Sequence, residues 1–216
     1  MRALLLLVVS LAFVAGCGGG GDDTTTESVA TSADGCTSVD APAPRDPESL
    51  QAPTAALDAS KTYALTFDTS CGSFTVTLDP ELAPKTAASL VGLARAGYYD
   101  DTIFHRVVPG FVVQGGDPTQ SGSGGPGYTT VDVPPSDAAY TKGVVAMAKS
   151  PTEAPGTAGS QFFVVTGNNA GLPPEYAIVG KVTDGMDTVG RIDALGVADG
   201  PPSKPVVVTS VTVRES

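Results

Sequence analysis

The 216-residue chain has no tryptophan, a single histidine and only three cysteines, and its acidic residues outnumber its basic ones. The formal net charge of −11 argues against nucleic acid as a partner, because a surface that binds nucleic acid must be basic. The cysteines form no CxxC pair, so the sequence supports neither a metal site nor dithiol redox chemistry. We expect no metal and no other cofactor. Nothing in the sequence signals oligomerisation, so a monomer is expected.

The chain also lacks an apolar run of about 20 residues, the length needed to span a bilayer as a helix. The N-terminal apolar stretch Ala3–Ala15 has 13 residues and follows Arg2, a pattern typical of a secretory signal peptide. Its end, Val14-Ala15-Gly16-Cys17, resembles a bacterial lipobox, in which the cysteine thiol receives a diacylglyceryl group. We therefore predict a lipoprotein signal peptide over residues 1–16 and lipidation of Cys17. Acyl chains such as palmitate would hold the protein on the extracytoplasmic face of a bacterial cell membrane. An ordinary signal peptide with an incidental cysteine is the alternative.

Residues 17–58 have the composition of a tether. After Cys17 this segment is rich in Gly, Ser, Thr, Pro and Ala, and it carries eight acids and one base without apolar periodicity. Such a segment cannot bury enough apolar area to offset the entropy of ordering it. We expect a flexible acidic coil, roughly 35 Å long on average, before a folded domain at residues 59–216. Cys36 in the tether and Cys71 in the domain are candidates for a disulfide, because an exported protein meets oxidising conditions. Two free thiols are the alternative.

The domain contains strand-like runs separated by Gly and Pro turns, and two helical patterns. The runs Lys61–Asp68 and Ser73–Leu78 flank a short turn and predict a hairpin. A helix is expected from Pro84 to Gly97 and another over Met186–Ala194. Further strands are expected at Ile103–Val107, Val112–Gly115, Gly143–Ala148, Phe162–Thr166, Ala177–Val182 and Val206–Val213. Eight short strands and two helices predict a mainly β fold, a closed eight-stranded antiparallel β-barrel with two capping α-helices.

The stretch FHRVVPGFVVQGGDP, Phe104–Pro118, places the single histidine beside Arg106 in apolar surroundings. One interpretation is a hydrolase with His105 as the base and Ser160 as the nucleophile, although the G-x-S-x-G motif is absent. Another is nucleotide binding through the glycines of GSGGPG, Gly122–Gly127, although no helical sequence follows them.

The third interpretation is rotation about an X-Pro bond, which requires neither a nucleophile nor a proton transfer. The uncatalysed barrier is about 20 kcal/mol, because rotation breaks the amide resonance. In the twisted transition state the prolyl nitrogen regains its lone pair and accepts hydrogen bonds. A guanidinium directed at this nitrogen binds the twisted state better than the planar one, and such differential binding is catalysis. An apolar pocket would hold the pyrrolidine ring.

The stretch Phe104–Pro118 strongly resembles the signature of the cyclophilin family of peptidyl-prolyl isomerases. So do GVVAMA (Gly143–Ala148), GSQFFVV (Gly159–Val165) and AIVGKVTDGMDTV (Ala177–Val189), which keep the family's order. The resemblance covers nearly all of residues 59–216 and implies a cyclophilin-like barrel with isomerase (rotamase) activity. It implies that Arg106 is catalytic, that Gln114 holds it in position and that His105 is a structural neighbour.

The resemblance also implies a substrate-binding surface. Its expected residues are Phe111, Val112, Phe163 and Leu172 around the proline ring, Ala148 and Lys149 on the edge that pairs with the peptide, Gln161 on the substrate backbone, and Tyr176 at the rim. The expected partners are proline-containing polypeptides, in particular exported ones whose folding the protein would assist outside the cytoplasmic membrane. Many family members carry other residues at Val112, Lys149 and Gly171, so a proline-binding scaffold lipoprotein with incidental isomerase activity stays open as the alternative.

Overall fold

The computed structural model describes residues 34–216 and places eleven strands and two helices there. The strands are β1 (Tyr63–Thr69), β2 (Gly72–Leu78), β3 (Thr102–Ile103), β4 (Arg106–Val108), β5 (Val112–Gly115), β6 (Thr130–Val131), β7 (Val144–Met147), β8 (Thr157–Ala158), β9 (Phe162–Val165), β10 (Ile178–Asp184) and β11 (Val207–Glu215). The helices are α1 (Pro84–Arg95) and α2 (Met186–Asp193). Within residues 34–216 no helix has the length and apolar character needed to cross a membrane. The predicted signal peptide and Cys17 lie outside the described residues.

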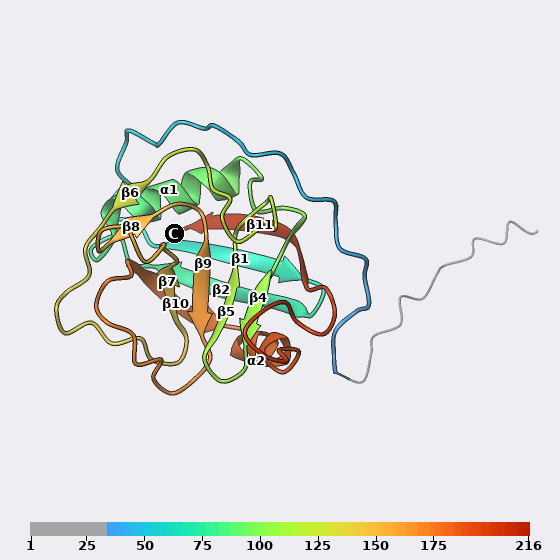
Figure 1. Ribbon diagram of the computed structural model, residues 1–216. Coiled ribbons are helices and arrows are strands. Elements are labelled where there is room, and N and C mark those ends of the chain that lie inside the picture. The colour runs from blue at the N-terminus through green and yellow to red at the C-terminus, as the bar shows by residue number, and fades with distance from the viewer. Residues whose placement is uncertain (1–33) are drawn as a thin grey trace, which may run out of the picture.

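Nine strands form one antiparallel sheet in the order β3-β11-β1-β2-β10-β7-β9-β5-β4, and β6 and β8 form a separate pair. Only Phe104 and His105 separate the two end strands, β3 and β4, so the sheet curls until its ends meet at this link (Figure 1). The mainly β architecture with two helices is confirmed, but the closed eight-stranded barrel is not. No β3–β4 ladder closes the sheet, because the Phe104 amide donates to Val206 and the Val107 amide donates to Gly200.

Most of the elements expected from the sequence are found. β1 and β2 form the predicted hairpin, with Ala64 opposite Thr77 and Thr69 opposite Gly72. The expected strand over Ile103–Val107 is split into β3 and β4 by the two residues Phe104 and His105. The two-residue strands β6 and β8 were not expected, because they are too short to produce an alternating pattern.

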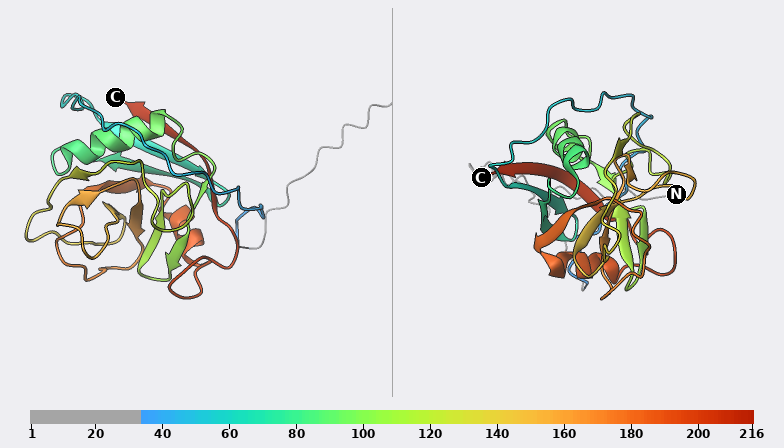
Figure 2. Two further views of the ribbon diagram at one scale, coloured as in Figure 1. Left: turned by 45° about the horizontal axis from the view of Figure 1, so that its top comes forward. Right: turned by 90° about the vertical axis from the view of Figure 1, so that its left-hand side faces the viewer.

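The helices cover opposite ends of the curled sheet (Figures 1 and 2). Helix α1 buries Ala87, Leu90, Val91 and Ala94, the spacing that predicted it, and Gly97 follows its end in a left-handed conformation (φ 69°). Below the sheet, Ile192 of α2 is fully buried. Neither helix therefore covers the outer face of strands β4, β5, β7 and β9.

A buried carboxylate fixes the start of α1. Asp132, just after β6, accepts hydrogen bonds from the amide and the hydroxyl of Thr86, both at 2.7 Å. Thr86 lies in the first helical turn, where the amides have no partner within the helix. We expect Asp132→Ala to lower the free energy of unfolding by about 1–3 kcal/mol, because it leaves a buried amide without an acceptor. Thermal unfolding would measure this. Asp137→Ala, at an exposed acid with no described contact, is the control, and equal melting temperatures for the two variants would contradict the capping role.

The described part of the expected tether is not a free coil. Residues 36–58, here called the strap, run along the outside of the domain past α1 (Figure 2). The Arg45 amide donates to Pro118 O at 2.9 Å, and the Leu50 amide donates to Pro126 O at 2.7 Å. This part of the expected tether is therefore hydrogen-bonded to the domain, through contacts that the sequence did not predict. The strap has no core of its own, but Leu50 and Leu57 pack against the core of the domain.

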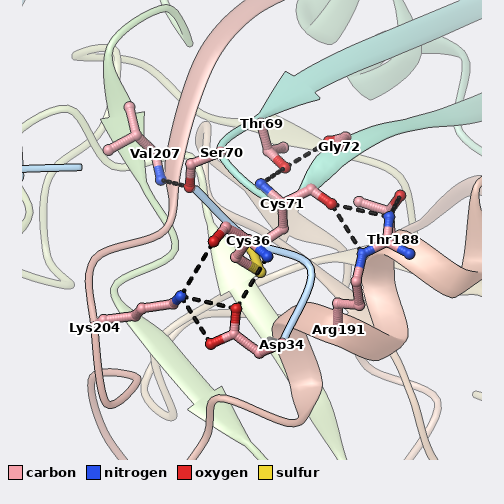
Figure 3. Close-up of a disulfide and its surroundings, with 10 residues drawn as sticks. All are labelled: Asp34, Cys36, Thr69, Ser70, Cys71, Gly72, Thr188, Arg191, Lys204 and Val207. Atoms are coloured by element: carbon pink, nitrogen blue, oxygen red, sulfur yellow. Dashed lines mark hydrogen bonds and ion pairs between the residues drawn. A yellow bond between two sulfur atoms is a disulfide. The ribbon is translucent and has the colours of Figure 1, made fainter. Parts of the chain in front are cut away.

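One end of the strap is joined to the β1–β2 turn by a disulfide between Cys36 and Cys71 (Figure 3). Both cysteines are buried within the main core. Arg191 of α2 donates from Nε and Nη2 to the Cys71 carbonyl, at 3.0 and 2.9 Å. On the other side, Lys204 Nζ forms an ion pair with Asp34 at 2.8 Å. The disulfide therefore joins the strap to the β1–β2 turn at a point that lies between α2 and the loop before β11.

Candidate functional site

Four neighbouring strands place one row of residues on a common face. Arg106 of β4 lies opposite Gln114 of β5, which lies opposite Phe163 of β9, which lies opposite Ala146 of β7. Paired residues in adjacent strands share a face of the sheet, and successive residues alternate between faces. The neighbours Val107, Val113, Val145, Phe162 and Val164 accordingly belong to the main core. The row from Arg106 to Ala146 faces the other way, and the candidate site is built there.

A second hydrophobic cluster, separate from the main core, lies on this outer face. We call it the apolar platform; its buried members are Val112, Tyr140, Val144, Ala146, Phe163 and Val165. Half-buried side chains packed against it include Phe111, Ala148, Leu172 and Tyr176. All six apolar and aromatic residues expected in the substrate site thus meet in one cluster. Val112 and Phe163, only 2% and 4% exposed, form its floor.

Short turns and aromatic contacts hold the rim of the platform. Phe111 follows Pro109-Gly110, where Gly110 has a φ of 69° and its amide donates to the Asp193 carboxylate at the end of α2. The Tyr176 ring meets the edge of Phe163 at a centroid distance of 5.7 Å. The hydroxyl of Tyr140 donates to Tyr176 O at 2.7 Å. These contacts keep the aromatic side chains in place beside the floor.

A line of polar side chains runs beside the platform. Arg106 Nη1 donates to Gln114 Oε1 at 3.2 Å, and Gln114 Nε2 donates to Gln161 Oε1 at 3.1 Å. Gln161 Nε2 then donates to Gly124 O at 2.9 Å. Each predicted polar residue therefore contacts the next, and the line connects the guanidinium to the glycine loop. Gln114 occupies the position expected of a residue that orients Arg106.

The opposite edge of the guanidinium meets a carboxylate that the sequence did not predict. Asp199 Oδ1 accepts from Arg106 Nε at 2.5 Å, and Oδ2 accepts from Nη2 at 3.1 Å. The hydrogen bond with Arg106 lowers the pKa of Asp199. Asp199 lies 93 residues further along the chain, in the Gly/Pro-rich loop between α2 and β11. No local pattern could have revealed a pair so far apart in the sequence.

The glycine loop is occupied by its own carboxylate, which removes the nucleotide-binding interpretation. Asp117 Oδ2 accepts from the amides of Gly122 and Gly124 at 2.7 and 3.1 Å, and Oδ1 accepts from the Thr119 amide at 2.8 Å. Burial alone would raise the pKa of Asp117, but these hydrogen bonds outweigh it and leave the pKa lowered. The amides that would hold a phosphate therefore already hold an anion.

The hydrolase interpretation has no support in the geometry. Ser160 is fully buried, and its hydroxyl donates to Gly116 O at 2.7 Å. The Tyr98 hydroxyl lies 3.2 Å from the same Ser160 oxygen, and the single Ser160 proton, directed at Gly116 O, is not directed at His105. Burial lowers the pKa of His105, which favours the neutral form of its imidazole. Ser160 and His105 are structural residues here.

A groove of about 1040 Å³ opens beside the platform. Gln114, Ala148, Lys149 and Gln161 line one part of it, and the glycine loop lines another. Pro47–Ser49 of the strap form a further wall, which the sequence did not predict. The lining of the groove does not include the platform residues Phe111, Val112, Phe163 and Leu172. The groove and the platform are therefore adjacent parts of one site.

Lys149 lies at the groove but its ammonium is turned into its own loop. Its side chain is only 2% exposed, and Nζ pairs with Glu175 at 3.1 Å. Nζ also donates to Glu153 O at 3.1 Å and lies 5.5 Å from the centre of the Tyr176 ring. The charge therefore stabilises the loop after β7, and only the main chain of Lys149 is left as a means of contacting a peptide.

A guanidinium held by two partners beside an apolar platform and an open groove defines a peptide-binding site suited to proline. The family model described as "Cyclophilin type peptidyl-prolyl cis-trans isomerase/CLD" matches residues 64–213. The chain therefore belongs to the cyclophilin-type peptidyl-prolyl cis–trans isomerase family.

Relatives and solved structures agree with this assignment. A probable peptidyl-prolyl cis-trans isomerase A of Mycobacterium leprae is 38% identical over 68% of this chain and 90% of its own length. A peptidyl-prolyl cis-trans isomerase-like 2 of Cryptococcus neoformans is 40% identical over 72% of this chain, but this chain spans only 28% of that relative. The crystal structure of a Cryptosporidium parvum cyclophilin-type isomerase has a TM-score of 0.65 and 30% identity, covering 71% of this chain and 98% of that one. The whole strap, residues 36–58, lies before the matched residues.

Proposed function

We propose that this chain is a peptidyl-prolyl cis–trans isomerase that acts on exported polypeptides and assists their folding outside the cytoplasmic membrane. The observation that carries the proposal is the placement of Arg106, whose guanidinium is fixed by Gln114 at 3.2 Å on the same face as the apolar platform. A structure of the Cryptosporidium relative was determined in the presence of the dipeptide Ala-Pro. A proline-containing peptide is the ligand class that this likeness suggests.

The proposed reaction uses binding alone. The platform, with Val112 and Phe163 as its floor, takes the pyrrolidine ring and excludes water from it. Gln161 and the main chain of Lys149 hold the peptide on the groove side. As the imide twists, its nitrogen becomes pyramidal and gains a lone pair, and Arg106 donates a hydrogen bond to it. Since the planar ground state offers no such acceptor, the interaction lowers the barrier rather than merely tightening binding.

The proposed location rests on two features. The N-terminal 17 residues have the pattern of a lipoprotein signal ending in Cys17. The buried Cys36–Cys71 disulfide supports export, because disulfides persist in oxidising compartments and are rare in the cytosol. We propose that acyl chains on Cys17 anchor the protein to the outer face of a bacterial cell membrane, with residues 18–58 connecting the anchor to the domain.

Turnover of a short Ala-Pro test peptide separates an enzyme from a scaffold. The full chain is expected to accelerate cis–trans exchange of the peptide, because Arg106 is directed at the reacting bond. It should also speed the proline-limited phase in the refolding of an exported protein. Binding of the same peptide with exchange at the uncatalysed rate would favour the proline-binding scaffold and overturn the isomerase proposal.

Metabolic labelling with palmitate tests the anchor independently of activity. The wild-type chain is expected to incorporate label and to sediment with membranes. Cys17→Ala is expected to lose both properties, because the acceptor thiol is gone, while Ser10→Ala, in the same segment, should keep them. Unlabelled wild-type protein would contradict the lipid anchor and leave the isomerase proposal standing.

A further inference from the structure

We propose that Asp199 is a positioning residue for catalysis, which holds the Arg106 guanidinium at the angle that isomerisation requires. This inference rests on the proposed isomerase function. Its basis is the two-point contact between one carboxylate and one guanidinium, with Oδ1 to Nε at 2.5 Å and Oδ2 to Nη2 at 3.1 Å. Two parallel hydrogen bonds of this kind fix the plane of a guanidinium as well as its position.

The remaining hydrogen-bond donors of Arg106 fit this role. A guanidinium has five N–H groups. Asp199 engages one on Nε and one on Nη2, and Gln114 engages one on Nη1. Two N–H groups therefore stay available, one on each Nη atom. Because Asp199 occupies the Nε–Nη2 edge of the guanidinium, these two N–H groups are the ones that can reach a prolyl nitrogen above the platform.

Gln114 alone would hold Arg106 poorly. One hydrogen bond to Nη1 leaves the guanidinium plane free to turn about that contact, and the long arginine side chain has several rotatable bonds. The Arg106 side chain is also 31% exposed, so packing does not immobilise it completely. The second, bidentate contact removes this freedom before substrate binds, which is what efficient catalysis requires of a transition-state donor.

The loop that carries Asp199 is itself tied to β4. The Val107 amide, adjacent to Arg106, donates to Gly200 O at 2.8 Å, and Ser203 N donates to Leu195 O at 2.8 Å. Gly196 lies so close to β4 that a Cβ there would approach Val107 to 2.9 Å. Asp199 is thus held against the strand that presents Arg106 by contacts on both of its sides.

The Asp199 carboxylate has two opposing effects on the rate. It positions the guanidinium, which raises the rate, and it partly neutralises the guanidinium charge, which lowers the rate. At the surface, a unit charge about 4 Å away changes the rate by about fivefold, because water screens it. Misplacing a catalytic group by about 1 Å costs about 100-fold. Positioning therefore outweighs neutralisation, and removal of Asp199 should lower kcat rather than raise it, by about tenfold or more.

The test compares Asp199→Ala and Asp199→Asn with wild type, using an Ala-Pro peptide for kinetics and the Arg106 Nε–H resonance for geometry. We expect both variants to lose about tenfold in kcat with KM nearly unchanged, because the platform still binds proline. Asp199→Asn should also lower kcat, since its side-chain NH₂ group would face an N–H group of Arg106 where a carboxylate oxygen now accepts. Asp199→Glu, which keeps both oxygens, should recover part of the loss. The Arg106 Nε–H signal should be distinct and slow to exchange in wild type and should exchange rapidly in Asp199→Ala.

Asp184→Asn is the matched control, because it changes the charge equally at an exposed site of β10. It should behave as wild type in both measurements. If wild type turns over the peptide and Asp199→Ala retains kcat within twofold, the positioning role is wrong and the isomerase function stands. A loss of kcat without any change at the Arg106 Nε–H would also overturn it. If wild type shows no turnover, the proposed function itself fails and the positioning role fails with it.

Discussion

Arg106→Ala is expected to lower kcat/KM for an X-Pro peptide by about 10²–10³-fold, the usual loss when one transition-state donor is removed. The loss should fall mainly on kcat, because the platform that binds the proline ring stays intact. Arg106 lies at the end of a row of paired strands, where Gln114 and Asp199 direct it. Its donors are useful only when the imide is twisted, so substrate affinity gains little from them.

Arg106→Lys sharpens this prediction. Lysine keeps the charge but not the planar fork, so it cannot engage Gln114 and Asp199 together while offering further donors to the imide. We expect it to recover only a small part of the activity. Arg214→Ala is the control, since Arg214 is exposed on β11 and no side-chain contact of it is found in the described structure. Activity of Arg106→Ala within threefold of wild type would show that the guanidinium does not carry the reaction.

Removing the Cys36–Cys71 disulfide is the change with the largest expected effect on stability. The cross-link closes a loop with a sequence separation of 35 residues. Opening a loop of this length restores entropy to the unfolded chain that corresponds to about 4 kcal/mol in the chain-entropy model, and 2–4 kcal/mol is the usual range. We expect the Cys36→Ser/Cys71→Ser variant to unfold roughly 10 °C lower than wild type, since each kcal/mol corresponds to about 2–4 °C in a chain of this size.

The same variant should loosen the strap before the domain unfolds. Amide exchange is expected to rise at Thr37 and Arg45, which donate to Ser70 O and Pro118 O. A reductant supplies the matched control: it should lower the melting temperature of wild type and leave that of the double variant unchanged. Unchanged stability of wild type after reduction, with both thiols shown to be free, would contradict the role given to the disulfide.

Residues close together in the sequence made much of the site predictable. β4, the Pro109-Gly110 turn and β5 form one hairpin, so Arg106 and Gln114 are brought opposite each other by local pairing alone. Period-two alternation then separates the two faces, with Val113 in the core and Val112 on the platform. The apolar run of β9, Phe162–Val165, lacks visible alternation because both of its faces are buried.

The parts that the sequence did not reveal depend on partners far along the chain. Composition describes only what a segment can bury by itself, whereas the strap packs Leu50 and Leu57 onto a core made by other residues. Asp199 reaches Arg106 because α2 and the following loop return to β4. The gap between β3 and β4 depends on the acceptor of the Phe104 amide, which is the Val206 carbonyl, far along the chain but adjacent in the fold.

A structure of the full chain with a bound Ala-Pro peptide tests the central claim most directly. The account predicts that the proline ring lies on Val112 and Phe163, with Arg106 still paired with Asp199. A free N–H of Arg106 should then lie at hydrogen-bonding distance, about 3 Å, from the imide group. A proline bound elsewhere, or a guanidinium turned away from the bound imide, would contradict it.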